Sequence, residues 1–209
     1  MRTIQKGPAP ATLTQHRQQP HANYDNYADK QGLRAALVAE QRGVCCYCQS
    51  RIRAMPAEMK IEHWQCQADF PELQLAYRNL LGACLGAKDR PREDQHCDSS
   101  KGNRALCFSV CDPERPVERH LNFLGDGRVQ SDDGAVNEAL DRVLNLNWHR
   151  LVANRKGVLE AFKQRLQAGH KLDPVRELRK WDGSRDGDLP EFAQVIVYWL
   201  KKRLRRVAA

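Results

Sequence analysis

The sequence predicts an α+β protein in which a small cysteine-held core is embedded in a mainly helical chain with one β-hairpin. Three observations predict this class. Six of the eight cysteines fall within residues 43–103, around a short segment of strand character. Apolar residues recur at helical spacing before and after that region. An Asp-Gly pair, typical of a two-residue hairpin turn, lies within residues 117–130.

The elements are expected in the following order. Residues 1–30 contain three prolines among Gln, His and Asn, which predicts an extended N-terminal arm. A core region over 31–112 begins with a helix over 31–42 and continues with a strand over 60–64 and a helix over 73–81. A third region over 113–209 holds the hairpin and then helices from residue 135, over 174–181 and over 192–204.

Composition limits the function classes. The chain has 209 residues, a net charge of +8 and a mean hydropathy of −0.70. No segment approaches the roughly 20 apolar residues that span a bilayer, and residues 1–20 lack the apolar run of a secretory leader. We therefore expect a cytoplasmic protein that does not enter membranes. Its basic character favours an acidic partner, of which nucleic acid is the commonest.

Cysteine spacing predicts a metal site. Cys45 and Cys48 form a C-x-x-C pair on one tight turn, which supplies half of the tetrahedral set that zinc prefers. Two other pairs could complete the set. One is Cys84 with Cys97, which twelve residues separate, and the other is Cys107 with Cys111. Spacing alone favours the second pair.

The neighbours of the cysteines favour the first pair. Glu62-His63 and Asn79-Leu80 lie between the two halves, Asp98 follows Cys97, and Lys101 follows three residues later. This order resembles the HNH endonuclease family over residues 43–103. The resemblance implies a ββα-metal core with structural zinc on the cysteines at 45, 48, 84 and 97.

A closer resemblance covers most of the chain. The stretches LRAALVAEQRGVCCYC, IEHW, NLLGAC and HCDSSKG, with LNLN near residue 145, are similar to the PtuB-type HNH subunits of Septu and retron-associated anti-phage systems. The resemblance implies an effector nuclease that works with a PtuA-like ATPase. The substrate would be nucleic acid, with DNA favoured over RNA such as transfer RNA.

Roles for individual residues follow from the resemblance and agree with the chemistry. His63 would be the general base, since an imidazole titrates near neutrality. Glu62 and Asp98 would bind a catalytic Mg²⁺ or Mn²⁺, for which carboxylates are good ligands. Asn79 would orient His63 or brace its loop, and Lys101 would contact a phosphate. The zinc would be structural only.

Two departures from the family pattern keep alternatives open. Twelve residues separate the second cysteine pair, where the family has two, and Glu62 and Asp98 replace more usual ligands. His96 could then replace a zinc ligand, Cys107 and Cys111 could bind a second metal, and Lys101 could be a solvated surface residue. A catalytically inactive zinc-knuckle module that binds nucleic acid, or a scaffold subunit, is the competing function.

Overall fold

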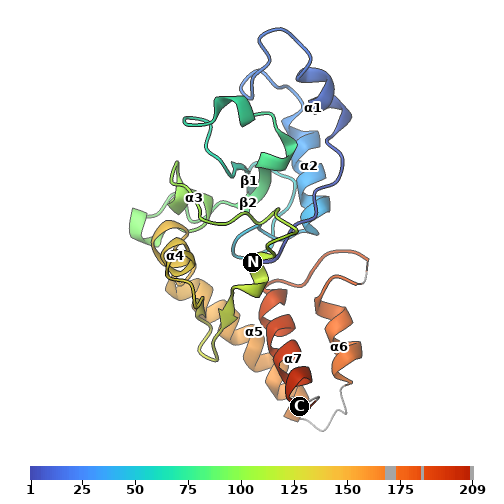
Figure 1. Ribbon diagram of the computed structural model, residues 1–209, viewed down its shortest axis with the longest axis vertical. Helices are drawn as coiled ribbons and strands as arrows, with labels where there is room; N and C mark the ends of the chain where they lie inside the picture. The colour runs from blue at the N-terminus through green and yellow to red at the C-terminus, as the bar shows by residue number, and fades with distance from the viewer. Residues whose placement is uncertain (168–172, 185, 208–209) are drawn as a thin grey trace.

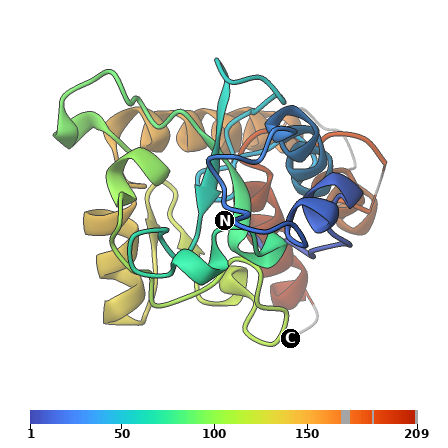
Figure 2. The same ribbon diagram turned by 90° about the horizontal axis from the view of Figure 1, so that it is seen from above.

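The computed structural model describes residues 1–167, 173–184 and 186–207. Its helices and two small antiparallel sheets make an α+β fold, which confirms the predicted class. The elements are α1 (Ala11–His16), α2 (Lys30–Gln41), β1 (Met59–His63), η1 (Pro71–Leu73), η2 (Tyr77–Asn79), β2 (Leu80–Cys84), η3 (Arg92–Asp94), α3 (Asp98–Lys101), η4 (Val117–Arg119), β3 (Asn122–Phe123), β4 (Val129–Gln130), α4 (Gly134–Glu138), η5 (Ala139–Val143), α5 (His149–Gln167), α6 (Pro174–Trp181) and α7 (Ala193–Val207). Figure 1 shows α1 and α2 at one end, α5, α6 and α7 at the other, and β1 and β2 between them. Seen from above in Figure 2, helical segments lie around these strands.

The N-terminal segment is folded against the rest of the chain, which corrects the prediction of an extended arm. It contains α1, whose Leu13 is fully buried against Leu33 and Leu37 of α2. Nearer the start, the Ile4 amide donates to the Val110 carbonyl at 2.7 Å. The few apolar residues of this segment have no helical or strand period, so the pattern did not reveal that they reach the core.

Helix α2 confirms the predicted helix over 31–42 to within one residue. The Asp29 side chain caps it by accepting from the Gly32 amide at 2.8 Å. Leu33 and Leu37, one turn apart, give it a buried face. Arg42 ends it in the left-handed conformation, with φ of 55°.

The central sheet is an antiparallel pair in which Met59 of β1 faces Cys84 of β2 and His63 faces Leu80. Strand β1 confirms the predicted strand, but the helix expected over 73–81 is wrong. That segment forms only the short turn η2, and its apolar end continues into β2, which is buried along its whole length. The hydrogen bonds between β1 and β2, and the burial of both faces of β2, outweigh the weak helical spacing of the apolar residues in this segment. The short helix α3 follows, from Asp98 to Lys101.

The predicted hairpin is confirmed. Strands β3 and β4 pair antiparallel with Phe123 opposite Val129. Gly127 takes φ of +93° at the turn, a conformation that glycine adopts without steric cost. The Asn147 side chain then donates to the Val129 carbonyl and accepts from its amide, both at 2.9 Å, which joins the hairpin to the segment before α5.

The C-terminal region is helical as predicted. The side chain of Asp133 caps α4, which continues into the π-helical turn η5 before α5. Helix α7 packs against both α5 and α6. Among the described residues, no helix is both long enough and apolar enough to cross a membrane.

Candidate functional site

Four buried cysteines converge on one point. The sulfur atoms of Cys45, Cys48, Cys84 and Cys97 all lie within 4.8 Å of one another. The Cys45–Cys97 and Cys48–Cys84 sulfur distances are 3.9 and 3.7 Å. A zinc ion with Zn–S bonds of about 2.3 Å at the centre of a tetrahedron would place its sulfurs about 3.8 Å apart. The donor set and its spacing therefore fit a structural metal such as zinc, with no open coordination position.

Local backbone geometry brings the four sulfurs together. The amide of Cys45 donates to the Ser50 carbonyl at 2.9 Å, which closes the turn that carries the C-x-x-C pair. The Cys46 amide donates to Gly82 of β2 at 3.0 Å, and this bond fixes the turn beside Cys84. Cys97 stands just before α3 with φ of 57°, a left-handed conformation that costs energy in a non-glycine residue.

The alternative ligands do not join this cluster. His96 places Nδ1 3.2 Å from the Cys97 sulfur and stacks on Trp148, so it borders the cluster without being one of the four. Cys107 is exposed and Cys111 half-buried. Within the described ranges, the four cysteines are the only group of three or more metal-ligating side chains.

A buried cation lies near the cluster. Arg155 of α5 is 3% exposed and donates to the carbonyls of Gly127 and Leu146 at 2.6 and 2.7 Å. Burial lowers the pKa of Arg155 to about 10, while the charges of Cys48 and Cys97 act in the opposite direction. Because a metal with four thiolates carries net negative charge, this guanidinium offsets part of it.

Two carboxylates meet beside the cluster. Glu62 of β1 is 2% exposed and accepts from the Tyr47 hydroxyl at 2.8 Å and from the Lys101 ammonium at 2.9 Å. Asp98, at the start of α3, forms an ion pair with Lys60 at 3.2 Å. The structure therefore brings Glu62, Asp98 and Lys101 together, from segments that lie far apart in the sequence.

The pKa values of the two carboxyl groups shift in opposite directions. Burial, together with the hydrogen bond and charge of Asp98, raises the pKa of Glu62 well above its ordinary value. Burial opposes ionisation of Asp98 as well, but hydrogen bonds from Glu62 and Lys60 hold its pKa below the ordinary value. Of the two acids, Glu62 is therefore the one that takes up a proton more readily, because burial and the neighbouring Asp98 both disfavour its charged form.

Lys101 lies deeper than the sequence led us to expect. It is 1% exposed, so it is not a solvated surface lysine. Its ammonium contacts Glu62 and donates to the His63 carbonyl at 3.1 Å. It therefore faces the carboxylate pair, where we had expected it to face a phosphate. The physical reason is that a buried carboxylate needs a cationic partner.

The His63 ring is held in one tautomer. Its Nε2 lies 3.0 Å from the Gln74 carbonyl. A carbonyl oxygen can only accept, so Nε2 carries the proton and Nδ1 is left with its lone pair. The ring is 8% exposed, and the edge of Tyr24 packs on it at 4.6 Å between centroids. Burial lowers the pKa of His63, which favours the neutral ring.

The side chains of His63 and Glu62 point to opposite faces of β1, as those of adjacent residues in a strand do. Among the described residues no hydrogen bond joins the His63 ring to either carboxylate. In the described part of the chain, no hydrogen bond joins the Asn79 side chain to His63 either. It donates to the carbonyls of Gln65 and Leu73 at 2.9 and 3.2 Å, and it accepts from the Gln65 amide at 2.7 Å. Asn79 therefore braces the loop that supplies the carbonyl for His63.

Several contributors to the site were missed by sequence reasoning. Lys60 was detectable, because residues two apart in a strand share a face and it precedes Glu62 by two. Tyr47, between the paired cysteines, was detectable as a buried hydroxyl in need of a partner. No sequence pattern indicated Tyr24 or the Gln74 carbonyl. Tyr24 lies far from His63 in the sequence, and the Gln74 carbonyl is a backbone group that every residue has.

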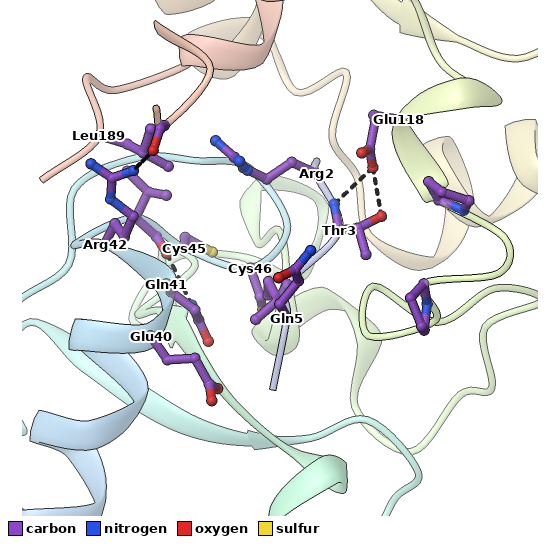
Figure 3. Close-up of a pocket in the computed structure, with 15 residues that line it drawn as sticks. Arg2, Thr3, Gln5, Glu40, Gln41, Arg42, Cys45, Cys46, Glu118 and Leu189 are labelled. Atoms are coloured by element: carbon purple, nitrogen blue, oxygen red, sulfur yellow. Dashed lines mark hydrogen bonds between the residues drawn. The ribbon is translucent and has the colours of Figure 1, made fainter. Parts of the chain in front are cut away.

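A separate cavity of about 400 Å³ adjoins the other side of the cysteine turn, with Cys45, Cys46, Arg2 and Arg42 among the residues that line it (Figure 3). Three of its charged side chains are engaged within the protein. Arg2 donates to the Asp182 carbonyl, Arg42 donates to the Gly183 and Gly187 carbonyls, and Glu118 accepts from Thr3. These bonds hold the N-terminal segment in place, so we do not assign a ligand to this cavity.

Comparison with known proteins finds no family model that matches the sequence and no curated protein with significant similarity to it. The function must therefore be argued from the residues and their arrangement.

Proposed function

We propose that this chain is a metal-dependent endonuclease of the HNH type, which hydrolyses phosphodiester bonds of nucleic acid, DNA by preference and RNA as the second choice. The observation that carries the proposal is the meeting of Glu62 from β1 and Asp98 from α3 beside the four-cysteine cluster. A paired β1 and β2 followed by a short helix is the order of elements that the resemblance to HNH nucleases implies.

The carboxylate pair suits a hard divalent cation. Mg²⁺ is commonly bound by one or two carboxylates and completes its shell with water. Glu62 and Asp98 lie together in a buried setting, and a cation between them would favour the ionised form of both. When bound, Mg²⁺ or Mn²⁺ would neutralise charge on the phosphate and on the leaving oxygen. Lys60 and Lys101 hold the two carboxylates in position from either side.

His63 suits the role of general base. Because its Nε2–H is committed to the Gln74 carbonyl, proton transfer from water would take place at Nδ1. Its lowered pKa keeps that lone pair free near neutrality. Asn79 and Gln74 are positioning residues, which act on the reaction only through the orientation of His63.

The test is cleavage of supercoiled plasmid and of total transfer RNA by the purified protein, with Mg²⁺ or Mn²⁺. His63→Ala should lower the rate by about 10²–10⁴-fold, the usual effect of removing a positioned general base. His120→Ala removes an exposed histidine and is the matched control. Asp98→Asn should also lose activity, with partial recovery at higher Mn²⁺, whereas His63→Ala should not recover.

The competing function is an inactive module that binds nucleic acid or acts as a scaffold. One observation favours it, namely that the His63 ring is only 8% exposed beneath Tyr24. The same assay separates the two functions. If His63→Ala cleaves at the unchanged rate, or if the wild-type protein cleaves neither substrate, the nuclease proposal is wrong and the binding module is the better account.

The proposal extends to a biological setting by resemblance. We propose that the chain is the effector nuclease of a cytoplasmic anti-phage system and docks a PtuA-like ATPase through its N-terminal segment and its helical C-terminal region. Co-expression with such an ATPase, followed by size-exclusion chromatography, tests this. A monomer that elutes apart from the ATPase would count against the partner without affecting the nuclease assignment.

A further inference from the structure

A groove runs between the C-terminal halves of α5 and α7, two helices that Figure 1 shows side by side at the end of the molecule away from β1 and β2. It encloses about 340 Å³, enough for two or three apolar side chains. Buried side chains form its floor, with Leu159, Phe162 and Leu200 at most 4% exposed. The groove is thus an apolar recess outside the candidate active site.

Cations surround this recess. Lys163, Lys202 and Arg203 line it, and no Asp or Glu among the described residues does. In the part of the chain that the structure describes, none of the three forms an ion pair. The ammonium groups of Lys163 and Lys202 lie 4.8 and 5.7 Å from the centre of the Trp199 ring. The rim therefore carries positive charge without compensation from carboxylates.

The indole of Trp199 adds an independent observation. Its Nε1 is buried, and it has no acceptor among the described residues. An indole N–H can only donate, and buried donors in native proteins are nearly always paired. Because Trp199 lines the groove, an occupant that offers a carbonyl or carboxylate oxygen could supply this acceptor once the indole N–H turns toward it.

We propose that this groove binds an acidic amphipathic segment of a partner protein. An apolar side chain of that segment would insert over Leu159 and Phe162, and its carboxylates would pair with Lys163 and Lys202. An oxygen of the segment would accept from Trp199. The proposal goes beyond the nuclease function and does not depend on it.

Other occupants fit less well. A second copy of this chain would bring its own positive charge, since each carries a net charge of +8. A nucleic acid would pair with the cations but would leave the apolar floor unfilled. An acidic peptide with apolar residues on one face complements the charge, the floor and the indole together.

The experiment uses the full chain and three fluorescein-labelled probes. The first is a peptide of about three helical turns with Leu and Phe on one face and Glu on the other. The second replaces each Glu by Lys, and the third is a single-stranded oligonucleotide. Fluorescence anisotropy measures binding of each probe at low salt. We expect the acidic peptide to bind and the basic peptide to bind at least about tenfold more weakly.

Variants assign the binding to the groove. Lys163→Glu with Lys202→Glu should weaken binding of the acidic peptide about tenfold or more, because both rim charges are reversed. Lys201→Glu reverses one charge on α7 outside the groove, as Lys202→Glu alone does within it, and should stay within about twofold. Trp199→Phe keeps an aromatic ring without the N–H and should weaken binding by several-fold. Circular dichroism would check that every variant is folded.

Three results would overturn the proposal. One is that the acidic peptide does not bind at a concentration of about 1 mM, because a dissociation constant above that value is too weak for specific recognition. Another is equal binding of the two peptides. The third is that the oligonucleotide binds more tightly than the acidic peptide and that its binding depends on the same lysines, which would assign the groove to nucleic acid.

Discussion

We predict that the four-cysteine cluster binds a structural zinc ion and that removal of this ion unfolds the protein. Structural zinc contributes about 10–16 kcal/mol in small zinc-binding peptides, while whole domains are stable by only about 5–15 kcal/mol. The four sulfurs come from three segments, namely the turn of Cys45 and Cys48, the end of β2, and the residue before α3. Without the ion these segments would be held only by ordinary packing, and the four thiols would remain buried.

The magnitude can be expressed as a change in the melting temperature. For a chain of this size, 1 kcal/mol corresponds to about 2–4 °C. Loss of about 10 kcal/mol would therefore lower the melting temperature by about 20 °C or more, or leave no folded protein at room temperature. Cys84→Ala should behave like removal of the metal, because it deletes one of the four ligands.

Cys46→Ala is the matched control. Cys46 is 3% exposed and lies on the same turn, but its sulfur is not part of the four-cysteine cluster. Its loss should cost about 1 kcal/mol, the typical effect of a single core substitution. Elemental analysis should find about one zinc per chain in the wild type and in Cys46→Ala. Equal melting temperatures for the two variants, or soluble folded wild type without zinc, would refute the reasoning.

Three further predictions concern two residues beside the site and one residue of the N-terminal helix α1. Tyr24→Ala should lower cleavage about 2- to 13-fold, since an edge contact on His63 is worth about 0.5–1.5 kcal/mol, whereas Tyr24→Phe should not. Lys101→Met should reduce the free energy of unfolding by about 3–5 kcal/mol, because it leaves Glu62 buried without its cation. Leu13→Ala should cost about 2–5 kcal/mol, as expected of a fully buried leucine.

Matched controls accompany two of these measurements. Lys88→Met removes an exposed lysine and should change stability by less than about 0.5 kcal/mol. Thr14→Ala, on the exposed face of α1, should likewise be close to neutral. Denaturant unfolding measures all four variants. If Leu13→Ala proved as mild as Thr14→Ala, α1 would not be packed on α2 in solution.

Residues with a local signal were predicted well. The Asp126-Gly127 turn defined the hairpin, and the spacing of Leu33 and Leu37 defined α2. The members of the four-cysteine cluster could not be chosen from local spacing, because spacing alone preferred Cys107 and Cys111 over Cys84 and Cys97. The acidic and basic neighbours of Cys97 decided the choice, and the converging sulfurs agree with it.

Features that depend on distant partners could not be predicted. The apolar residues of 73–81 suit a helix in isolation, but pairing of Leu80 with His63 makes β2 a strand. Lys101 is a charged residue in a polar stretch, and only the buried Glu62 explains why it lies inside. The tautomer of His63 depends on a backbone carbonyl, and no side-chain pattern encodes that contact.

The C-terminal region completes the structure around the four-cysteine cluster. Its Leu144 carbonyl accepts from the Cys97 amide at 2.8 Å, and the amide of Phe192 donates to Gln49 on the cysteine turn at 3.0 Å. Arg155 adds positive charge near the sulfurs. Cys97, Leu144 and Phe192 belong to one hydrophobic core that runs across residue 112, where the sequence suggested a boundary. The four-cysteine cluster therefore depends on residues from both regions, and a fragment that ends at residue 112 would lose the contacts that hold Cys97 in its strained conformation.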